Sequence, residues 1–145
     1  MSVAKTCIPG ALIAVPILLA PLSGAAAATD LEGLWRTDDG KAVVRIAACG
    51  QRICGTIARV LDTSPDVPRT DVNNPDARLR DQPLVGLRIL SGFLGGPTEW
   101  KDGRAYDPKS GNSYKSSLRL NADGSLRVTG CVLFVCQSQR WTRAG

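Results

Sequence analysis

Short stretches of alternating apolar and polar residues, separated by turn residues, recur from Thr29 to the end of this 145-residue chain. No segment in that region carries a long helical period. This pattern is typical of an all-β sandwich or barrel. We expect eight strands, at residues 31–36, 42–48, 53–61, 84–93, 99–106, 113–120, 126–132 and 137–142.

Eight consecutive antiparallel strands most simply close into an up-and-down barrel, because closure removes the exposed edges of an open sheet. Such a barrel either holds one small ligand or fills itself with side chains, and the sequence leaves both open. Asp102-Gly103 interrupts the fifth strand as a bulge or as a tight turn. With a bulge, the odd-to-even connections share one end of the barrel, and that end includes the proline-rich loop 63–83, which has a helical turn at 76–79.

The first 28 residues have the order of a secretory signal peptide: a lone positive charge at Lys5, an apolar run over 8–22 and small residues over 24–28. The apolar run is shorter than the roughly 20 residues of a membrane span and is broken by prolines. We therefore expect cleavage near Thr29 and a single domain over residues 29–145, periplasmic or secreted, with no transmembrane segment.

Four cysteines follow the signal peptide, as the pairs Cys49/Cys54 and Cys131/Cys136. An even number in an exported chain predicts disulfides. Five steps along an extended strand separate two Cα atoms by about 16 Å, whereas a disulfide tolerates at most about 7 Å. Each pair is therefore predicted to close a β-hairpin. The alternative, a metal site of four cysteines, requires closer spacing and a reducing compartment.

The chain contains no histidine. This removes the Ser-His-Asp and Cys-His nucleophile systems and the usual zinc ligands, so we expect neither catalysis nor a metal or cofactor. The formal net charge of +5 is spread along the chain, without the basic patch that nucleic-acid binding requires. The charge is better suited to a loose attraction to anionic envelope surfaces.

Two groups of carboxylates remain as candidates for chemistry. Residues 71–76 offer oxygen ligands for calcium, but the order of an EF-hand is absent and Asx residues beside proline favour turns. Glu32 and Glu99 are the only glutamates, and nothing in the sequence brings them together as a glycosidase pair.

Several motifs together resemble the domain-of-unknown-function family 2147, exported bacterial proteins with a lipocalin-like barrel. The motifs are Gly33-Leu34-Trp35, Cys49-Gly50 with Cys54-Gly55, residues 71–76, residues 84–87, residues 106–111 and Trp141-Thr142-Arg143. The resemblance spans essentially the whole mature chain and implies a fold but no activity. Gly33 and Trp35 with a late arginine are also similar to the lipocalin pattern, which implies that Arg143 or Arg140 lies over Trp35 in a structural cation–π contact.

A ligand-binding barrel requires an apolar lining with few polar groups. Trp100, Tyr106 and Tyr114 are candidate pocket walls, and Arg88 is a candidate inward charge for an acidic headgroup. The apolar tip 132–135, which includes Phe134, either folds inward and plugs the barrel or borders a ligand mouth, a lipid or a protein.

The leading hypothesis is therefore a non-catalytic barrel that binds a small amphipathic or hydrophobic ligand. The second is a filled barrel that acts as a protein-interaction module of the cell envelope. The third, an enzyme, requires carboxylates clustered in a cleft with perturbed titration.

Overall fold

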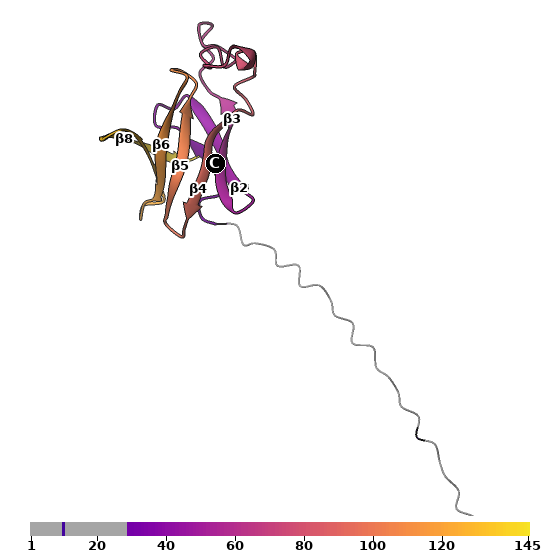
Figure 1. Cartoon of the computed structure of the whole chain (residues 1–145), viewed down its shortest axis with the longest axis vertical. Coiled ribbons are helices and arrows are strands. Elements are labelled where there is room, and N and C mark those ends of the chain that lie inside the picture. Colours follow the sequence, from indigo (N-terminus) through magenta and orange to yellow (C-terminus); the bar gives the residue numbers. More distant parts are fainter. Residues whose placement is uncertain (1–9, 11–28) are drawn as a thin grey trace, which may run out of the picture.

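A computed structural model describes residue 10 and residues 29–145 (Figure 1). It is a closed antiparallel barrel in which each strand pairs with its neighbours in sequence and the last returns to the first. The predicted fold class is confirmed. The predicted signal peptide lies outside the described residues, apart from Gly10. The elements are β1 (Gly33–Arg36), β2 (Ala42–Cys49), β3 (Arg52–Val60), the 3-10 helix η1 (Ala77–Leu79), β4 (Arg88–Gly95), β5 (Glu99–Asp107), β6 (Asn112–Leu120), β7 (Leu126–Val132) and β8 (Val135–Arg143).

Apolar side chains at alternate strand positions fill one half of the barrel. The largest of them, Trp35, Phe93 and Trp100, are at most 2% exposed. They pack with Leu31, Val44, Ile46, Ile53, Leu90, Leu118, Leu126, Val128 and Trp141. Most of these residues lie toward the end with the short β2–β3, β4–β5 and β6–β7 connections, so this end is the closed one. No helix among the described residues is long and apolar enough to cross a membrane.

The interruption of β5 at Asp102-Gly103 is a bulge. The pairing of β5 with β6 shifts register between Trp100 and Gly103, and Asp102 has a φ of 61°. A bulge of this kind bends the strand without ending it. Residues 29–145 therefore form eight strands, and the alternative of a ninth in this region is wrong.

One strand boundary, the start of β4, differs from expectation by more than two residues, and the start of β8 shortens a turn. β4 begins at Arg88 rather than at Leu84, because Leu84 to Leu87 form a turn in which the Leu87 amide donates to the Leu84 carbonyl at 3.0 Å. β8 begins at Val135, so the β7–β8 turn is only Leu133 and Phe134. The other strand ends lie within one or two residues of their predicted positions.

The connections from odd to even strands share one end of the barrel, as strand parity predicted. The long loop between β3 and β4 stands above that end (Figure 1). The Asn73 amide donates to the carbonyls of Pro108 and Lys109 in the β5–β6 turn, at 3.2 and 2.9 Å. Lys109 in turn forms an ion pair of 2.5 Å with Asp39 of the β1–β2 turn. These contacts fasten three connections together.

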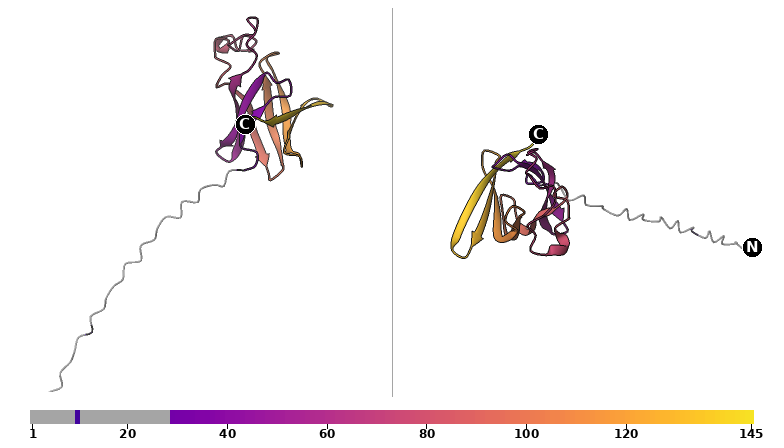
Figure 2. Two further views of the ribbon diagram at one scale, coloured as in Figure 1. Left: turned by 180° about the vertical axis from the view of Figure 1, so that it is seen from behind. Right: turned by 90° about the horizontal axis from the view of Figure 1, so that it is seen from above.

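The barrel closes between β8 and β1 through few pairs. β8 pairs with β1 only at Arg143 with Trp35 and at Thr142 with Arg36, whereas it pairs with β7 from Trp141 to Val135. The outer part of the β7–β8 hairpin consequently leans away from the rest of the barrel (Figure 2).

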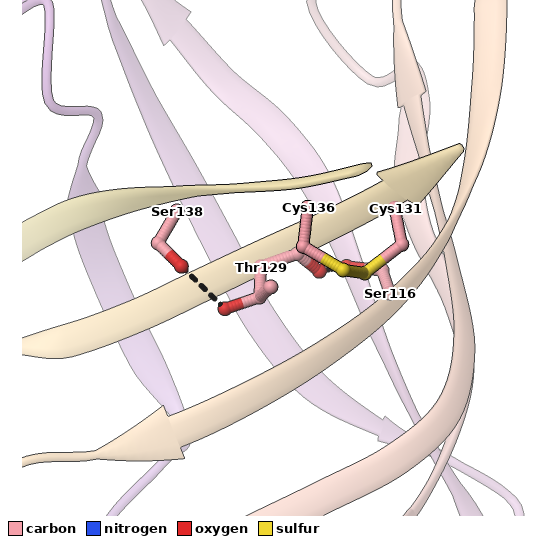
Figure 3. The surroundings of a disulfide bond; sticks show 5 residues. All are labelled: Ser116, Thr129, Cys131, Cys136 and Ser138. Atoms are coloured by element: carbon pink, nitrogen blue, oxygen red, sulfur yellow. Dashed lines mark hydrogen bonds between the residues drawn. A yellow bond between two sulfur atoms is a disulfide. The ribbon is translucent and has the colours of Figure 1, made fainter. Parts of the chain in front are cut away.

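Both predicted disulfides are confirmed. Cys49–Cys54 joins the ends of β2 and β3 across a Cα separation of 5.8 Å. Cys131–Cys136 joins β7 and β8 directly behind their turn, with the Cα atoms 4.1 Å apart (Figure 3). Two residue pairs further from the tip, the Thr129 and Ser138 hydroxyls form a hydrogen bond of 2.8 Å across the same two strands (Figure 3).

Candidate functional site

A cavity of about 750 Å³ occupies the half of the barrel that carries the long loop. Its walls are mainly apolar and include Ala42, Ile57, Leu84, Ile89, Ala105, Val128, Gly130, Val132 and Val135. The inward positions Ala42, Ala105 and Gly130 are small, whereas the closed half has tryptophan and phenylalanine facing inward. Of the two alternatives for the barrel interior, the closed half is filled by side chains and the half that carries the long loop is hollow.

The polar residues of the cavity lining include Tyr106, Tyr114, Gln137 and Gln139. The Gln139 carbonyl accepts a hydrogen bond of 2.9 Å from the Trp141 indole. Within residues 29–145, neither the Tyr114 hydroxyl nor the Gln137 amide has a hydrogen-bond partner from the protein. These two groups are therefore free to orient a polar atom of a ligand.

The rim of the cavity carries more negative than positive charge. Its acidic residues are Asp39, Asp62, Asp66 and Asp107, and its basic residues are Lys41 and Lys109. Both lysines are already paired, Lys109 with Asp39 at 2.5 Å and Lys41 with Asp62 at 3.5 Å. The rim therefore offers no unpaired cation to an acidic ligand.

Two of the rim carboxylates, Asp39 and Asp62, are held in their ionised form. Partial burial by itself would raise the pKa of Asp39, but hydrogen bonds from Lys109, Thr37 and the Lys41 amide outweigh it and lower that pKa to about 2. Hydrogen bonds from Ser64 lower the pKa of Asp62. At neutral pH both groups are therefore charged.

A buried carboxylate anchors the long loop beside the cavity. Asp71 is fully buried and accepts hydrogen bonds from the Tyr106 hydroxyl, at 2.8 and 2.9 Å, and from the Asn74 amide, at 2.7 Å. Burial first, and then the hydrogen bond to the negative Asp71, raise the pKa of Tyr106 to about 12. Tyr106 therefore remains a hydrogen-bond donor across the ordinary pH range.

The other acidic residue of this motif has a local role. The Asp76 carboxylate accepts from the backbone amide of Arg78 at 3.0 Å, at the start of η1, and pairs with the Arg78 guanidinium at 2.8 Å. Over the described part of the chain, no three acidic or cysteine side chains are grouped so that they could hold a metal ion.

Only some of the residues predicted to bind a ligand lie together at the cavity. Tyr106 and Tyr114 line the cavity. Trp100 is 2% exposed and belongs to the core of the closed half. Phe134 is fully exposed at the hairpin tip, so of the two alternatives for the tip the one in which it folds inward and plugs the barrel is wrong. Val132 and Val135 at its base line the cavity.

Arg88 is exposed and does not line the cavity. The cause is a bulge in β4: Leu90 is opposite Gly55, but Arg88 is opposite the next residue, Thr56, which leaves Ile89 as the extra residue. The extra residue reverses the alternation. Arg88 therefore lies opposite an outward position, and the expected inward charge for an acidic headgroup is absent from the cavity.

Gln137 and Gln139 were not predicted as cavity residues, although the strand pattern of the sequence indicates their position. They occupy alternate positions with Trp141 in a strand that was predicted correctly. Because alternate residues share a face, an inward Trp141 places both glutamines on the cavity side of β8, where they line the cavity while remaining exposed.

The closed end is covered by Arg143, whose guanidinium lies 4.0 Å from the centre of the Trp35 ring. It also donates hydrogen bonds to the carbonyls of Glu32, at 2.7 Å, and Asp30. A Cβ atom at Gly33 would lie 2.7 Å from this guanidinium, so the glycine makes room for it. The other candidate, Arg140, pairs with Asp123 instead.

A family model described as "Uncharacterized protein conserved in bacteria (DUF2147)" matches residues 33–143. Among solved structures, the chain is similar to the one described as "Protein HP1028 from the human pathogen Helicobacter pylori belongs to the lipocalin family". The TM-score is 0.72 at 22% identity, and the match covers 81% of this chain and 84% of the other. This likeness shows a lipocalin-like fold. No curated protein matches the chain.

Proposed function

The chain belongs to the DUF2147 family of bacterial proteins, and from this premise and the geometry of the barrel we propose that it binds a small amphipathic or hydrophobic molecule without catalysing a reaction. The cavity carries the proposal. Its volume of about 750 Å³ falls within the roughly 300–1,000 Å³ of small-molecule sites, and apolar walls with a few polar groups are typical of such sites.

The lining suggests how a ligand would lie. An apolar tail fits between Ile57, Ile89 and Val128, where the inward residues are aliphatic. The polar end would then meet the Tyr114 hydroxyl or the Gln137 amide and extend toward the acidic rim. Because both rim lysines are paired, a neutral or cationic polar end suits the site better than an acidic one.

The absence of catalysis is supported by the residue types present. The chain has no histidine, and the four cysteines after residue 28 are joined in disulfides, so neither an imidazole base nor a thiolate from these residues faces the cavity. The buried Asp71 is fully engaged by Tyr106 and Asn74, which leaves it no route to a substrate.

The proposal places the protein outside the cytoplasm. Residues 1–28 would serve as a cleaved signal peptide, and residues 29–145 would form one exported domain, periplasmic or secreted. Two disulfides support this location, because they persist in oxidising compartments and are rare in the cytosol.

The direct test is native mass spectrometry of protein purified from the periplasm of its own organism, which shows whether a small molecule is carried. Titration with the neutral fluorescent probe N-phenyl-1-naphthylamine tests the cavity itself. Ala105→Phe places a ring in the cavity and should abolish probe uptake. Ser113→Phe places the same ring at an exposed position of β6 and should not change uptake. Equal uptake by the two variants would refute binding in the cavity.

A further inference from the structure

The tip of the β7–β8 hairpin is an exposed apolar surface. Leu133 is 90% exposed and Phe134 is fully exposed, and Val132 and Val135 beside them are 54% and 69% exposed. Hairpin turns usually carry glycine, asparagine or aspartate. Four consecutive apolar residues with this exposure to water therefore indicate a surface that contacts something else.

The backbone holds this tip in its exposed position. Leu133 has a φ of 52°, a conformation that is uncommon for residues other than glycine. The Cys131–Cys136 disulfide fastens the two strands directly behind the turn, and the hairpin leans away from the barrel (Figure 2). Leu133 thus occupies a backbone conformation in which glycine is the usual residue. The disulfide also limits how far the tip can fold back onto the barrel.

Cations lie directly behind the tip on the outer face of the sheet. Arg104 pairs with Lys115, Lys115 pairs with Cys131, and Cys131 pairs with Cys136 across β5 to β8. Residues in register share a face, so two exposed positive charges, Lys115 and then Arg104, follow the disulfide in this row. Neither Arg104 nor Lys115 forms an ion pair with any residue in the described part of the chain.

A second row of cations crosses the same face further from the tip. Glu99 is opposite Arg119, Arg119 is opposite Arg127, and Arg127 is opposite Arg140. Of the three arginines, only Arg140 has an ion-pair partner within the described ranges, Asp123. Like charges directly opposite one another destabilise a sheet, and this row keeps the outer face positive further from the tip, although it lies too near the closed end to meet a partner bound at the tip.

We propose that the protein docks on the surface of an anionic lipid bilayer, with the apolar tip of residues 132–135 in the boundary between headgroups and acyl chains and with Arg104 and Lys115 among the headgroup phosphates. The bilayer is chosen because of the order of groups along the hairpin: an apolar tip comes first and cations come behind it. This matches the order of acyl chains and anionic headgroups in a bilayer. Interfacial elements bury apolar groups about 5–10 Å deep in this way.

Other polyanions fit the surface less well. A nucleic acid or an acidic polysaccharide would neutralise the arginines but would leave Leu133 and Phe134 exposed to water. The docking proposal does not depend on which molecule the cavity holds. It adds that the cavity, whose wall includes Val132 and Val135, would face the bilayer surface when the protein is docked.

Vesicle flotation tests the proposal. The protein, purified with its disulfides formed, should float with vesicles that contain phosphatidylglycerol and phosphatidylcholine, and should remain unbound with phosphatidylcholine alone. Raising the salt concentration should weaken the binding, because the interaction between exposed charges is screened. Absence of flotation with the anionic vesicles would overturn the proposal.

Two pairs of variants locate the contact. Phe134→Asp should weaken vesicle binding roughly 10- to 100-fold, since a buried phenylalanine is lost. Leu94→Asp, at an exposed apolar position near the closed end, should not. Lys115→Glu should weaken binding about fivefold or more, whereas Lys101→Glu, the same change near the closed end, should not. Circular dichroism of each variant confirms that the barrel is retained.

The variants also separate a bilayer from a second copy of this chain. If light scattering shows a dimer that Phe134→Asp abolishes, while vesicles are not bound, the tip is a self-association surface and the bilayer proposal is overturned. Equal vesicle binding by Phe134→Asp and Leu94→Asp would overturn it as well.

Discussion

The Tyr106 hydroxyl donates to both carboxylate oxygens of Asp71, at 2.8 and 2.9 Å, across 35 positions of sequence. Tyr106 belongs to β5, and Asp71 belongs to the long loop between β3 and β4. Asp71 is fully buried, so the tyrosine and Asn74 together supply the hydrogen bonds that water would otherwise provide. The loop is therefore fastened to the barrel wall beside the cavity.

Tyr106→Phe should lower the free energy of unfolding by about 1–3 kcal/mol, because a buried carboxylate loses a donor. Urea denaturation measures the change. Tyr114→Phe is the matched control, since its hydroxyl has no partner from the protein within residues 29–145, and it should be nearly neutral. Equal destabilisation by the two variants would contradict the role given to Asp71.

Alkaline pH should weaken the same contact. The pKa of Tyr106 is raised from 10.0 to about 12 in the folded protein, so the folded state favours the protonated phenol. This contribution to stability is fully present below pH 10 and is lost as the pH rises toward 12. Unfolding free energies measured across that range should fall more steeply for the wild type than for Tyr106→Phe. Parallel curves would contradict the prediction.

The sequence was sufficient for the architecture because its main signals are local. Alternation within each strand set the inward faces, and the spacing of Cys131 and Cys136 required a chain reversal between them. Arg88 was predicted to face inward but faces outward. It follows a turn and precedes a bulge at Ile89. An extra residue reverses every preceding position, and no composition signal marks it.

The candidate site was less accessible from the sequence because it depends on which residues meet across strands. Ala42, Ala105 and Gly130 carry no individual sequence signal for a binding site, but they line the same cavity from three different strands. Trp100 is a typical pocket residue by type, yet its register with Leu118 places it in the filled half. The hollow half is therefore a property of the register and not of any motif.

Gly103→Ala should destabilise the barrel, whereas Gly130→Ala should not. A Cβ atom at Gly103 would collide with the Phe93 ring, while one at Gly130 would lie 3.4 Å from Tyr114 Cβ. Overpacking of a filled core typically costs about 1–3 kcal/mol. Thermal unfolding of the two variants measures the difference. A similar loss in both would show that the two halves of the barrel are equally packed.

Arg143→Ala should destabilise the closed end, because it removes both the contact with Trp35 and the hydrogen bonds to the carbonyls of Glu32 and Asp30. A loss of about 1–3 kcal/mol is expected from these charge-assisted contacts. Arg143→Lys keeps the charge but not the planar fork, so it should restore only part of the stability. Full restoration by lysine would show that charge alone matters. Chemical denaturation distinguishes the three proteins.

The charge of the rim predicts which amphiphile binds best. Among dodecylammonium, dodecanol and dodecanoate, which share one tail, displacement of N-phenyl-1-naphthylamine should be strongest for the ammonium and weakest for the carboxylate. The cause is the excess of aspartates over lysines at the mouth, together with the pairing of both lysines. Asp66→Asn removes a rim charge that has no ion-pair partner within residues 29–145 and should narrow the difference in affinity between the ammonium and the carboxylate by about two- to fivefold. Asp102→Asn removes a charge from the bulge of β5, away from the cavity lining, and should leave the order and spacing of the three affinities unchanged. Tightest binding by dodecanoate would refute the preference, because it would require an accessible cation that the described rim lacks.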